Sequence, residues 1–192
     1  METILGLCIG IGLSAAWGFR VFVPLLVMSV ATLAGLFEPS QGFEWLAMPS
    51  VCLALAIATI FDIAAYYVPW VDNLLDTIAT PAAVVAGTLS TMAVSSGEMS
   101  QFATWAAALI VGGGTAGVVQ MSTVAARGVS TATTGGLGNF VVATGELLGS
   151  IVLSILAFVM PVVITVFVII LVIVVARWIQ KKRQNNVDQS AY

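Results

Sequence analysis

Long apolar runs separated by short polar segments dominate this chain. A helix needs roughly 20 apolar residues to cross a hydrocarbon core about 30 Å thick. Inside hydrocarbon, only helices and closed barrels satisfy their own backbone groups, and runs such as VVITVFVIILVIVV lack the period-two alternation of barrel strands. The pattern predicts an all-α integral membrane protein with about six transmembrane helices, at residues 4–36, 46–69, 79–95, 102–126, 139–159 and 162–179.

The first of these spans is too long for one upright helix. At 1.5 Å per residue, residues 4–36 would extend about 50 Å, well beyond the thickness of the core. The span must therefore tilt strongly or break. Gly12, Gly18, Arg20 and Pro24 place the expected break near its middle, because proline removes an internal hydrogen bond and glycine tolerates a kink.

The two halves of the chain share features that suggest a repeat. GGGTAGVVQMSTVAAR in the fourth span can be aligned with GLSAAWGFRVFVPLL in the first, and the second and fifth spans end in YYVP and FVMP. If residues 1–96 and 102–180 are repeats, each has three crossings, and an odd number gives them opposite orientations, as in many secondary transporters. Apolar sequences rich in Gly, Ala and Ser also align by chance, so an inverted repeat and chance similarity are equal alternatives.

Composition and charge place the chain in a membrane and suggest its orientation. Hydrophobic residues make up 60% of it and charged residues 8%, which leaves too little polar surface for a soluble globule. Basic residues at 181–183 follow the last span and Arg127 ends the fourth, and cytoplasmic loops carry the Lys and Arg excess. We expect one membrane domain over 1–180 in the bacterial inner membrane, with a basic cytoplasmic tail over 181–192. Six crossings then put both termini in the cytoplasm, and METILGLCIG is expected to be a retained first helix because it lacks a basic leading region.

A polar segment, PWVDNLLDTIATP, separates the second and third spans. Asp72 and Asp76 are four residues apart and so share one face of a helix, opposite Val71, Leu74 and Ile78. This pattern predicts a short amphipathic helix at the inner membrane interface. Its two acids are either a solvated face or part of an ion pathway.

Ionisable side chains inside the predicted spans are the first candidates for function, because a charge near the bilayer centre costs about 2.5 to 3.5 kcal/mol. Asp62 lies about seven residues before the end of the second span, and Glu146 about seven residues into the fifth. Both acids are therefore expected at a similar depth, where they either share a polar cavity suited to proton or cation exchange or brace neighbouring helices. Arg20 is either the counter-ion of an acid or substrate, or a structural or snorkelling side chain.

A stretch rich in hydroxyls and glycines, STATTGGLGN, joins the fourth and fifth spans. We expect a turn containing Thr133, Thr134, Gly135 and Gly136, with Asn139 as the N-cap of the fifth helix. Such a turn offers N–H groups to an anion or carbonyls to a cation, with Arg127 and Glu146 nearby. The alternative is an ordinary cytoplasmic turn.

Several of these segments together resemble a known family. GFRVFVP, VPWVDNLLDTIATPAA, ARGVSTATTGGLGNFVVATGELL and FVMP are similar to an uncharacterised bacterial membrane family catalogued as domain of unknown function 4126, over about 6–178. The TTGGLGN block followed by an acid is the most specific part. The resemblance implies a small polytopic membrane protein and no agreed activity. Members often carry a second acid after the glutamate, and Leu147 here weakens any mechanism that needs an acidic pair.

The hypothesis that these features favour is a small transporter or channel for an ion or small polar solute. A six-helix chain of 19.9 kDa has little room for an enclosed pore, so we expect a homo-oligomer in contact with membrane lipids. The alternative is a structural or accessory membrane subunit. An enzyme is disfavoured because the chain has no His and no metal-ligand motif, so no catalytic residue, metal or cofactor is expected. Nucleic acid is not an expected partner, since the one basic cluster, KKR, is explained by topology.

Overall fold

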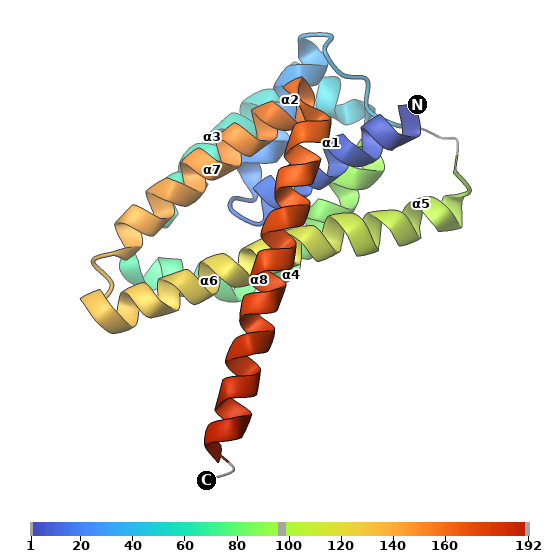
Figure 1. The fold of residues 1–192 in the computed structure, drawn as a ribbon. Helices are drawn as coiled ribbons and strands as arrows, with labels where there is room; N and C mark the ends of the chain where they lie inside the picture. Colours follow the sequence, from blue (N-terminus) through green and yellow to red (C-terminus); the bar gives the residue numbers. More distant parts are fainter. Residues whose placement is uncertain (1, 96–98, 191–192) are drawn as a thin grey trace.

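The computed structural model describes residues 2–95 and 99–190, without the side chains of 2, 3, 69, 70, 72–76, 176, 178, 179 and 181–190. Over this part of the chain the structure contains helices and no strand, which confirms the all-α prediction (Figure 1). The helices are α1 Glu2–Trp17, α2 Phe22–Leu33, the 3₁₀ helix η1 Glu44–Ala47, α3 Pro49–Ala65, α4 Pro69–Val94, α5 Gln101–Ala107, the π-helical segment η2 Ala108–Gly113, α6 Gly114–Thr134, α7 Asn139–Val159 and α8 Pro161–Ser190.

Within the part of the chain that the structure describes, three helical segments are long and apolar enough to cross a membrane: Thr77–Val94, Gln101–Thr134 and Asn139–Val159. Four shorter apolar helical stretches accompany them, at Ile4–Trp17, Phe22–Leu33, Pro49–Ala65 and Pro161–Val175. Large apolar side chains cover the outside of the bundle; Phe61, Ile110 and Val141 are each at least 70% exposed. A surface this apolar is compatible with lipid as its solvent.

Helix α1 lies at the centre of the bundle, in contact with α4, α6, α7 and α8. Its residues Leu13, Ser14, Ala15 and Ala16 are completely buried. Small side chains permit this packing, because a Cβ atom added at Gly12 would lie 2.8 Å from Ala157 Cβ. Close approach through small residues is the usual way in which helices associate in lipid.

Helices α1 and α2 form a hairpin that enters and leaves at the same end of the bundle (Figure 1). The first half of α1 lies beside the start of α8, where Thr165 Oγ1 donates a hydrogen bond of 3.1 Å to Cys8 O. The chain that follows α2 returns to this end, where the ring centroids of Phe37 and Phe158 are 5.4 Å apart. The prediction that residues 4–36 make one crossing is therefore wrong.

The physical reason for this difference is the geometry of the break. The predicted break is present, at residues 18–21 between α1 and α2. Arg20 is held in the interior by a hydrogen bond from its Nη2 to Ala143 O, and the chain reverses direction there. A sequence marks where a helix breaks but not the angle at which the chain continues.

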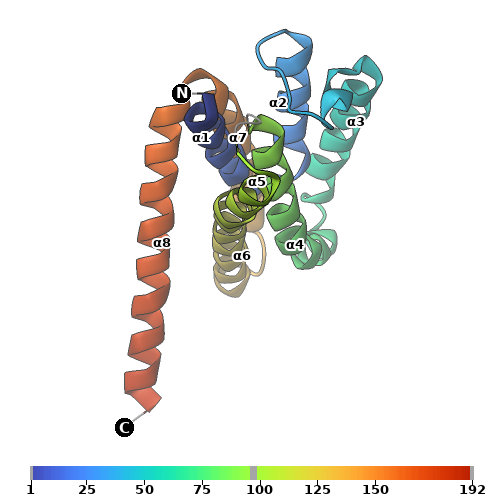
Figure 2. The same ribbon diagram turned by 90° about the vertical axis from the view of Figure 1, so that its right-hand side faces the viewer.

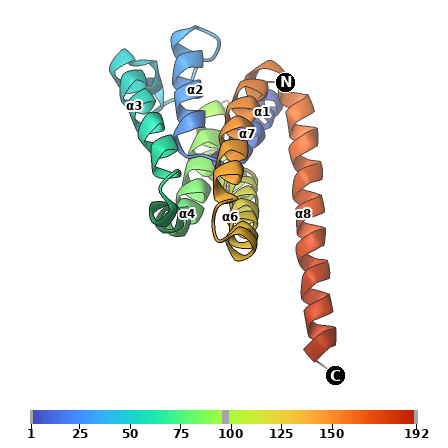
Figure 3. The same ribbon diagram turned by 90° about the vertical axis from the view of Figure 1, so that its left-hand side faces the viewer.

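Helices α3 and α4, the continuous α5–η2–α6, α7 and α8 then run along the bundle (Figures 2 and 3). The last half of α8 extends beyond the other helices. The start of α1 and the end of α8 lie at opposite ends of the molecule (Figure 1). On which side of a membrane each terminus lies stays a prediction.

The segment predicted as a separate interfacial helix is instead the first part of α4. Helix α4 continues without interruption from Pro69 to Val94 and contains Pro81. The prediction of an amphipathic helix distinct from the third span is therefore wrong. Asp72 and Asp76 lie in the backbone of α4, but their side chains are outside the described residues, so their role in a pathway stays a prediction.

Helices α5 and α6 form one long rod interrupted by the π-helical segment η2. Here the rod packs closely on α4: a Cβ atom at Gly87 would lie 2.7 Å from Ala116 Cβ and 2.8 Å from Gly112 O. A Cβ atom at Gly113 would lie 2.7 Å from Thr88 Oγ1. The absence of side chains at these positions is what allows the backbones of η2 and α4 to meet.

Candidate functional site

The structure places Arg127 of α6 and Glu146 of α7 in a buried ion pair. Their exposed fractions are 3% and 4%. Arg127 Nε donates a hydrogen bond of 3.0 Å to Glu146 Oε1, and Arg127 Nη2 donates to Glu146 Oε2. The two-pronged geometry is the strongest that an arginine and a carboxylate adopt. Both oxygens of Glu146 are occupied by this pair.

Arg20 and Asp62 form a second buried pair with a different geometry. Arg20 is 1% exposed, and the side chain of Asp62 is 8% exposed. Arg20 Nη1 lies 3.9 Å from Asp62 Oδ2, which is a charge interaction but too long for a hydrogen bond. Among the described residues, Arg20 Nε, Arg20 Nη1 and Asp62 Oδ2 have no hydrogen-bond partner.

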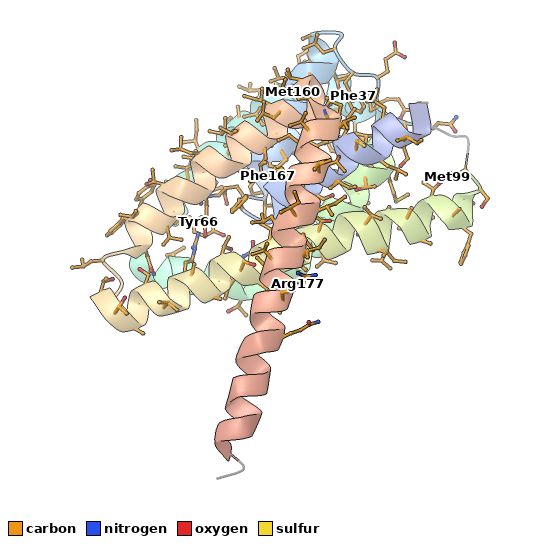
Figure 4. The ribbon with its side chains drawn as sticks, viewed as in Figure 1. Phe37, Tyr66, Met99, Met160, Phe167 and Arg177 are labelled. Carbon is orange, nitrogen blue, oxygen red and sulfur yellow. The ribbon has the colours of Figure 1, made fainter. Side chains whose placement is uncertain are left out.

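Tyr66 joins the two pairs. Its ring centroid lies 3.9 Å from the guanidinium carbon of Arg20 and 4.3 Å from that of Arg127. Aromatic faces attract cations, most strongly where water is excluded, and Tyr66 is 5% exposed. Figure 4 shows Tyr66 in the angle between α6 and α7.

Arg20, Asp62, Tyr66, Arg127 and Glu146 together form what we call the charge cluster. Arg20 interacts electrostatically with Asp62, Glu146 and Arg127, and Asp62 also interacts with Glu146. Two arginines and two acids balance, so the four side chains carry no net charge when all are ionised. The structure thus brings together four of the residues selected from the sequence.

Tyr66 was not among those selected residues. A tyrosine near the end of an apolar span suggests the aromatic belt at a membrane interface. The available signal was its spacing, because Asp62 and Tyr66 are four residues apart and so lie on one helical face.

The hydroxyl and glycine stretch lies elsewhere. Helix α6 continues through Thr134, and the turn consists of 135–138, with φ of 64° at Gly135 and 93° at Gly136. Thr133 Oγ1 donates to Val129 O at 2.9 Å, and Thr134 Oγ1 donates to Ser130 O at 2.7 Å. These hydroxyls are exposed and bond the helix that carries them.

Asn139 does not have the predicted N-cap role. It is the first residue of α7, and Gly138 occupies the cap position. The Asn139 side chain instead donates from Nδ2 to Thr131 Oγ1 at 3.1 Å, which ties α7 to α6. Thr133, Thr134, Gly135, Gly136 and Asn139 therefore form an exposed helix–helix turn, separated from Glu146 by about 10 Å of α7.

Two cavities adjoin the interior. One of about 290 Å³ lies between α6, α7 and α8, bordered by Glu146, Ser122 and Thr123 among apolar side chains. Another of about 540 Å³ lies between α2 and α4, and its walls, which include Trp17 and Pro81, are almost entirely apolar. Within the described residues, no three His, Cys, Asp or Glu side chains gather as a metal site would require.

These features define a small helical bundle with membrane-length apolar helices around a neutral cluster of buried charges. The sequence model of the family described as Domain of unknown function (DUF4126) matches residues 7–181, and the chain belongs to that family. The match confirms the resemblance predicted from the sequence and includes every residue of the charge cluster. No curated protein and no solved structure matches the chain.

Proposed function

We propose that this protein is an integral membrane protein of the bacterial inner membrane that transports or conducts an ion or small polar solute through the charge cluster. Ionised groups inside a bilayer cost several kcal/mol and commonly mark substrate or ion pathways. Four such groups meet here around one tyrosine. This concentration of charge is the reason to place the pathway at the cluster and not at the exposed α6–α7 turn.

The observation that carries the proposal is the contrast between the two ion pairs. A pair that only braces helices is expected to close, as Arg127 and Glu146 do. Arg20 and Asp62 stay 3.9 Å apart and leave buried donors and an acceptor without hydrogen bonds among the described residues. Unsatisfied buried polar groups cost about 1–3 kcal/mol each, so they point to a bound partner.

The hairpin of α1 and α2 supports the same conclusion. Non-helical backbone at membrane depth is tolerated only where it is buried in protein or lines a polar cavity. The break at 18–21 carries Arg20 into the interior. Broken helices of this kind form the binding sites of many secondary transporters.

In this proposal α3, α4, α5–α6, α7 and α8 cross the membrane and the α1–α2 hairpin is re-entrant. The end of the bundle that holds the α6–α7 turn and the basic tail faces the cytoplasm, by the Lys and Arg excess. The start of α1 then faces the exterior. Helices α3 and α7 run in opposite directions, as do α4 and α8, which supports an inverted relation between the two halves (Figure 3). A homo-oligomer remains part of the proposal.

The test is flux through the purified protein in liposomes, measured for protons, K⁺, Cl⁻ and small polar solutes. We expect one of these to pass faster than through empty vesicles, and Asp62→Asn to reduce that rate. Thr134→Val is the matched control, because Thr134 is exposed and bonds only its own helix and turn in the described structure. An equal loss in both variants, or wild-type flux no faster than the lipid alone, would contradict the proposal.

The second candidate function is an accessory membrane subunit. The closed Arg127–Glu146 pair favours it, because this pair ties α6 directly to α7. A stoichiometric larger protein recovered in mild detergent, together with the absence of flux, would support this function over transport.

A further inference from the structure

The two buried pairs differ in what each leaves for a ligand, and this difference indicates the substrate class of the proposed pathway. We propose that Arg20 and Asp62 together bind an uncharged hydroxyl-bearing molecule, either water or a small polyol. This inference rests on the proposed function, since it names what passes through the same site.

The hydrogen-bond inventory of Arg20 is the first step. Its Nη2 is occupied by Ala143 O at 2.9 Å, and its guanidinium lies against the Tyr66 ring. The donors left over are Nε and Nη1, and the nearest acidic atom, Asp62 Oδ2, is an acceptor that also lacks a hydrogen bond among the described residues. A ligand at this place must accept from Arg20 and donate to Asp62.

The separation of these atoms sets the size of the bridging group. Consider a single oxygen that forms hydrogen bonds of about 2.8 Å to both partner atoms. If the angle at this oxygen between the two partners is near 90°, the partners lie about 4 Å apart. Arg20 Nη1 and Asp62 Oδ2 are 3.9 Å apart. An oxygen that both donates and accepts is a hydroxyl or a water, whereas an amide uses two different atoms for these roles. The spacing of the two atoms therefore matches a bridge through one hydroxyl oxygen.

The charge balance of the cluster is the second, independent step. Arg20 and Arg127 offset Asp62 and Glu146, so the cluster is neutral before anything binds when all four side chains are ionised. A bare cation or anion would leave one uncompensated charge in a region where the four side chains are at most 8% exposed. A neutral hydroxyl compound preserves the balance and still satisfies the open donors and acceptor.

Proteoliposomes examined by stopped-flow light scattering provide the test, with water and glycerol as the two hydroxyl probes and K⁺ and Cl⁻ flux measured in parallel. The variant is the double substitution Arg20→Gln with Asp62→Asn, which removes both charges together and leaves none unpaired. We expect water or glycerol permeation above that of empty vesicles, and about a tenfold loss in the double variant, the effect of one hydrogen bond to a charged group. Thr134→Val should permeate like the wild type, and gel filtration with circular dichroism checks that both variants fold.

Each outcome has a distinct meaning. Permeation of water alone, or of glycerol as well, supports the inference and separates a water path from a polyol path. Flux of K⁺ or Cl⁻ without either hydroxyl probe overturns the inference and leaves transport standing. Undiminished hydroxyl permeation in the folded double variant also overturns it, and absence of every flux overturns both proposals.

Discussion

Replacing Glu146 by glutamine should destabilise the protein strongly, because it removes one charge from a closed and buried pair. Arg127 is 3% exposed and would keep its positive charge while losing the carboxylate that accepts from its Nε and Nη2. Removing one partner of a buried ion pair costs about 3–5 kcal/mol. The remaining attraction to Tyr66, 4.3 Å from the guanidinium carbon, places the expected loss near the lower end of that range.

The assay is denaturant unfolding in detergent micelles, followed by tryptophan fluorescence. Against a total stability of about 5–15 kcal/mol, a loss of this size is easily resolved. The double variant Arg127→Met with Glu146→Leu removes both charges and keeps apolar volume, and it should recover most or all of the stability. Glu38→Gln is the control for loss of an acid, because Glu38 is exposed in the chain between α2 and η1.

Two results would refute this reasoning. If Glu146→Gln unfolds at the same denaturant concentration as the wild type, the pair is not buried away from water as the structure shows. If the apolar double variant is as unstable as the single variant, the loss comes from packing and not from an uncompensated charge.

Three further predictions concern packing, acid stability and topology. Gly87→Ala should lower the free energy of unfolding by about 1–3 kcal/mol, because it overpacks α4 against η2. Gly114 faces open space, so Gly114→Ala should stabilise its helix by up to about 1 kcal/mol. Thermal unfolding of the two variants distinguishes these effects. Backbone hydrogen bonds from Glu44 itself and from Gly42 lower the pKa of the Glu44 carboxyl. The stability that they contribute is complete above the unfolded pKa of about 4.3 and is lost as the pH falls through the lower folded pKa. In a pH series of unfolding curves, Glu44→Gln should remove this loss of stability at acid pH. Protease-sensitive tags at the two termini should be cut from opposite sides of the membrane, and cleavage of both from one side would contradict the five-crossing arrangement.

The sequence was sufficient to locate the charged residues of the cluster but not to pair them. Arg20, Asp62, Arg127 and Glu146 stood out because charges in apolar runs are rare and costly. Their pairing depends on which helices become neighbours, and that follows from long-range packing such as the contact of Gly12 with Ala157. No local pattern encodes such a contact.

The same distinction explains two differences between the predicted and the observed local structure. The break in the first span follows from Gly18 and Arg20, but the reversal into a hairpin depends on where Arg20 finds Ala143. Thr133 and Thr134 were expected in the turn after the fourth span because threonines and glycines suggest bare backbone. In the structure Thr133 and Thr134 bond carbonyls one turn earlier, so the helix continues and the polar groups are satisfied locally.

The π-helical segment η2 has a consequence for the distant ion pair. A π-helix holds more residues per turn than an α-helix, so it changes the rotational phase of everything that follows it. Each residue of an α-helix turns the chain by about 100°, so removing a single residue from Ala108–Gly113 would rotate the side of α6 that carries Arg127 away from Glu146. The packing of η2 against α4 therefore determines the direction in which Arg127, several turns further along the same rod, projects from α6.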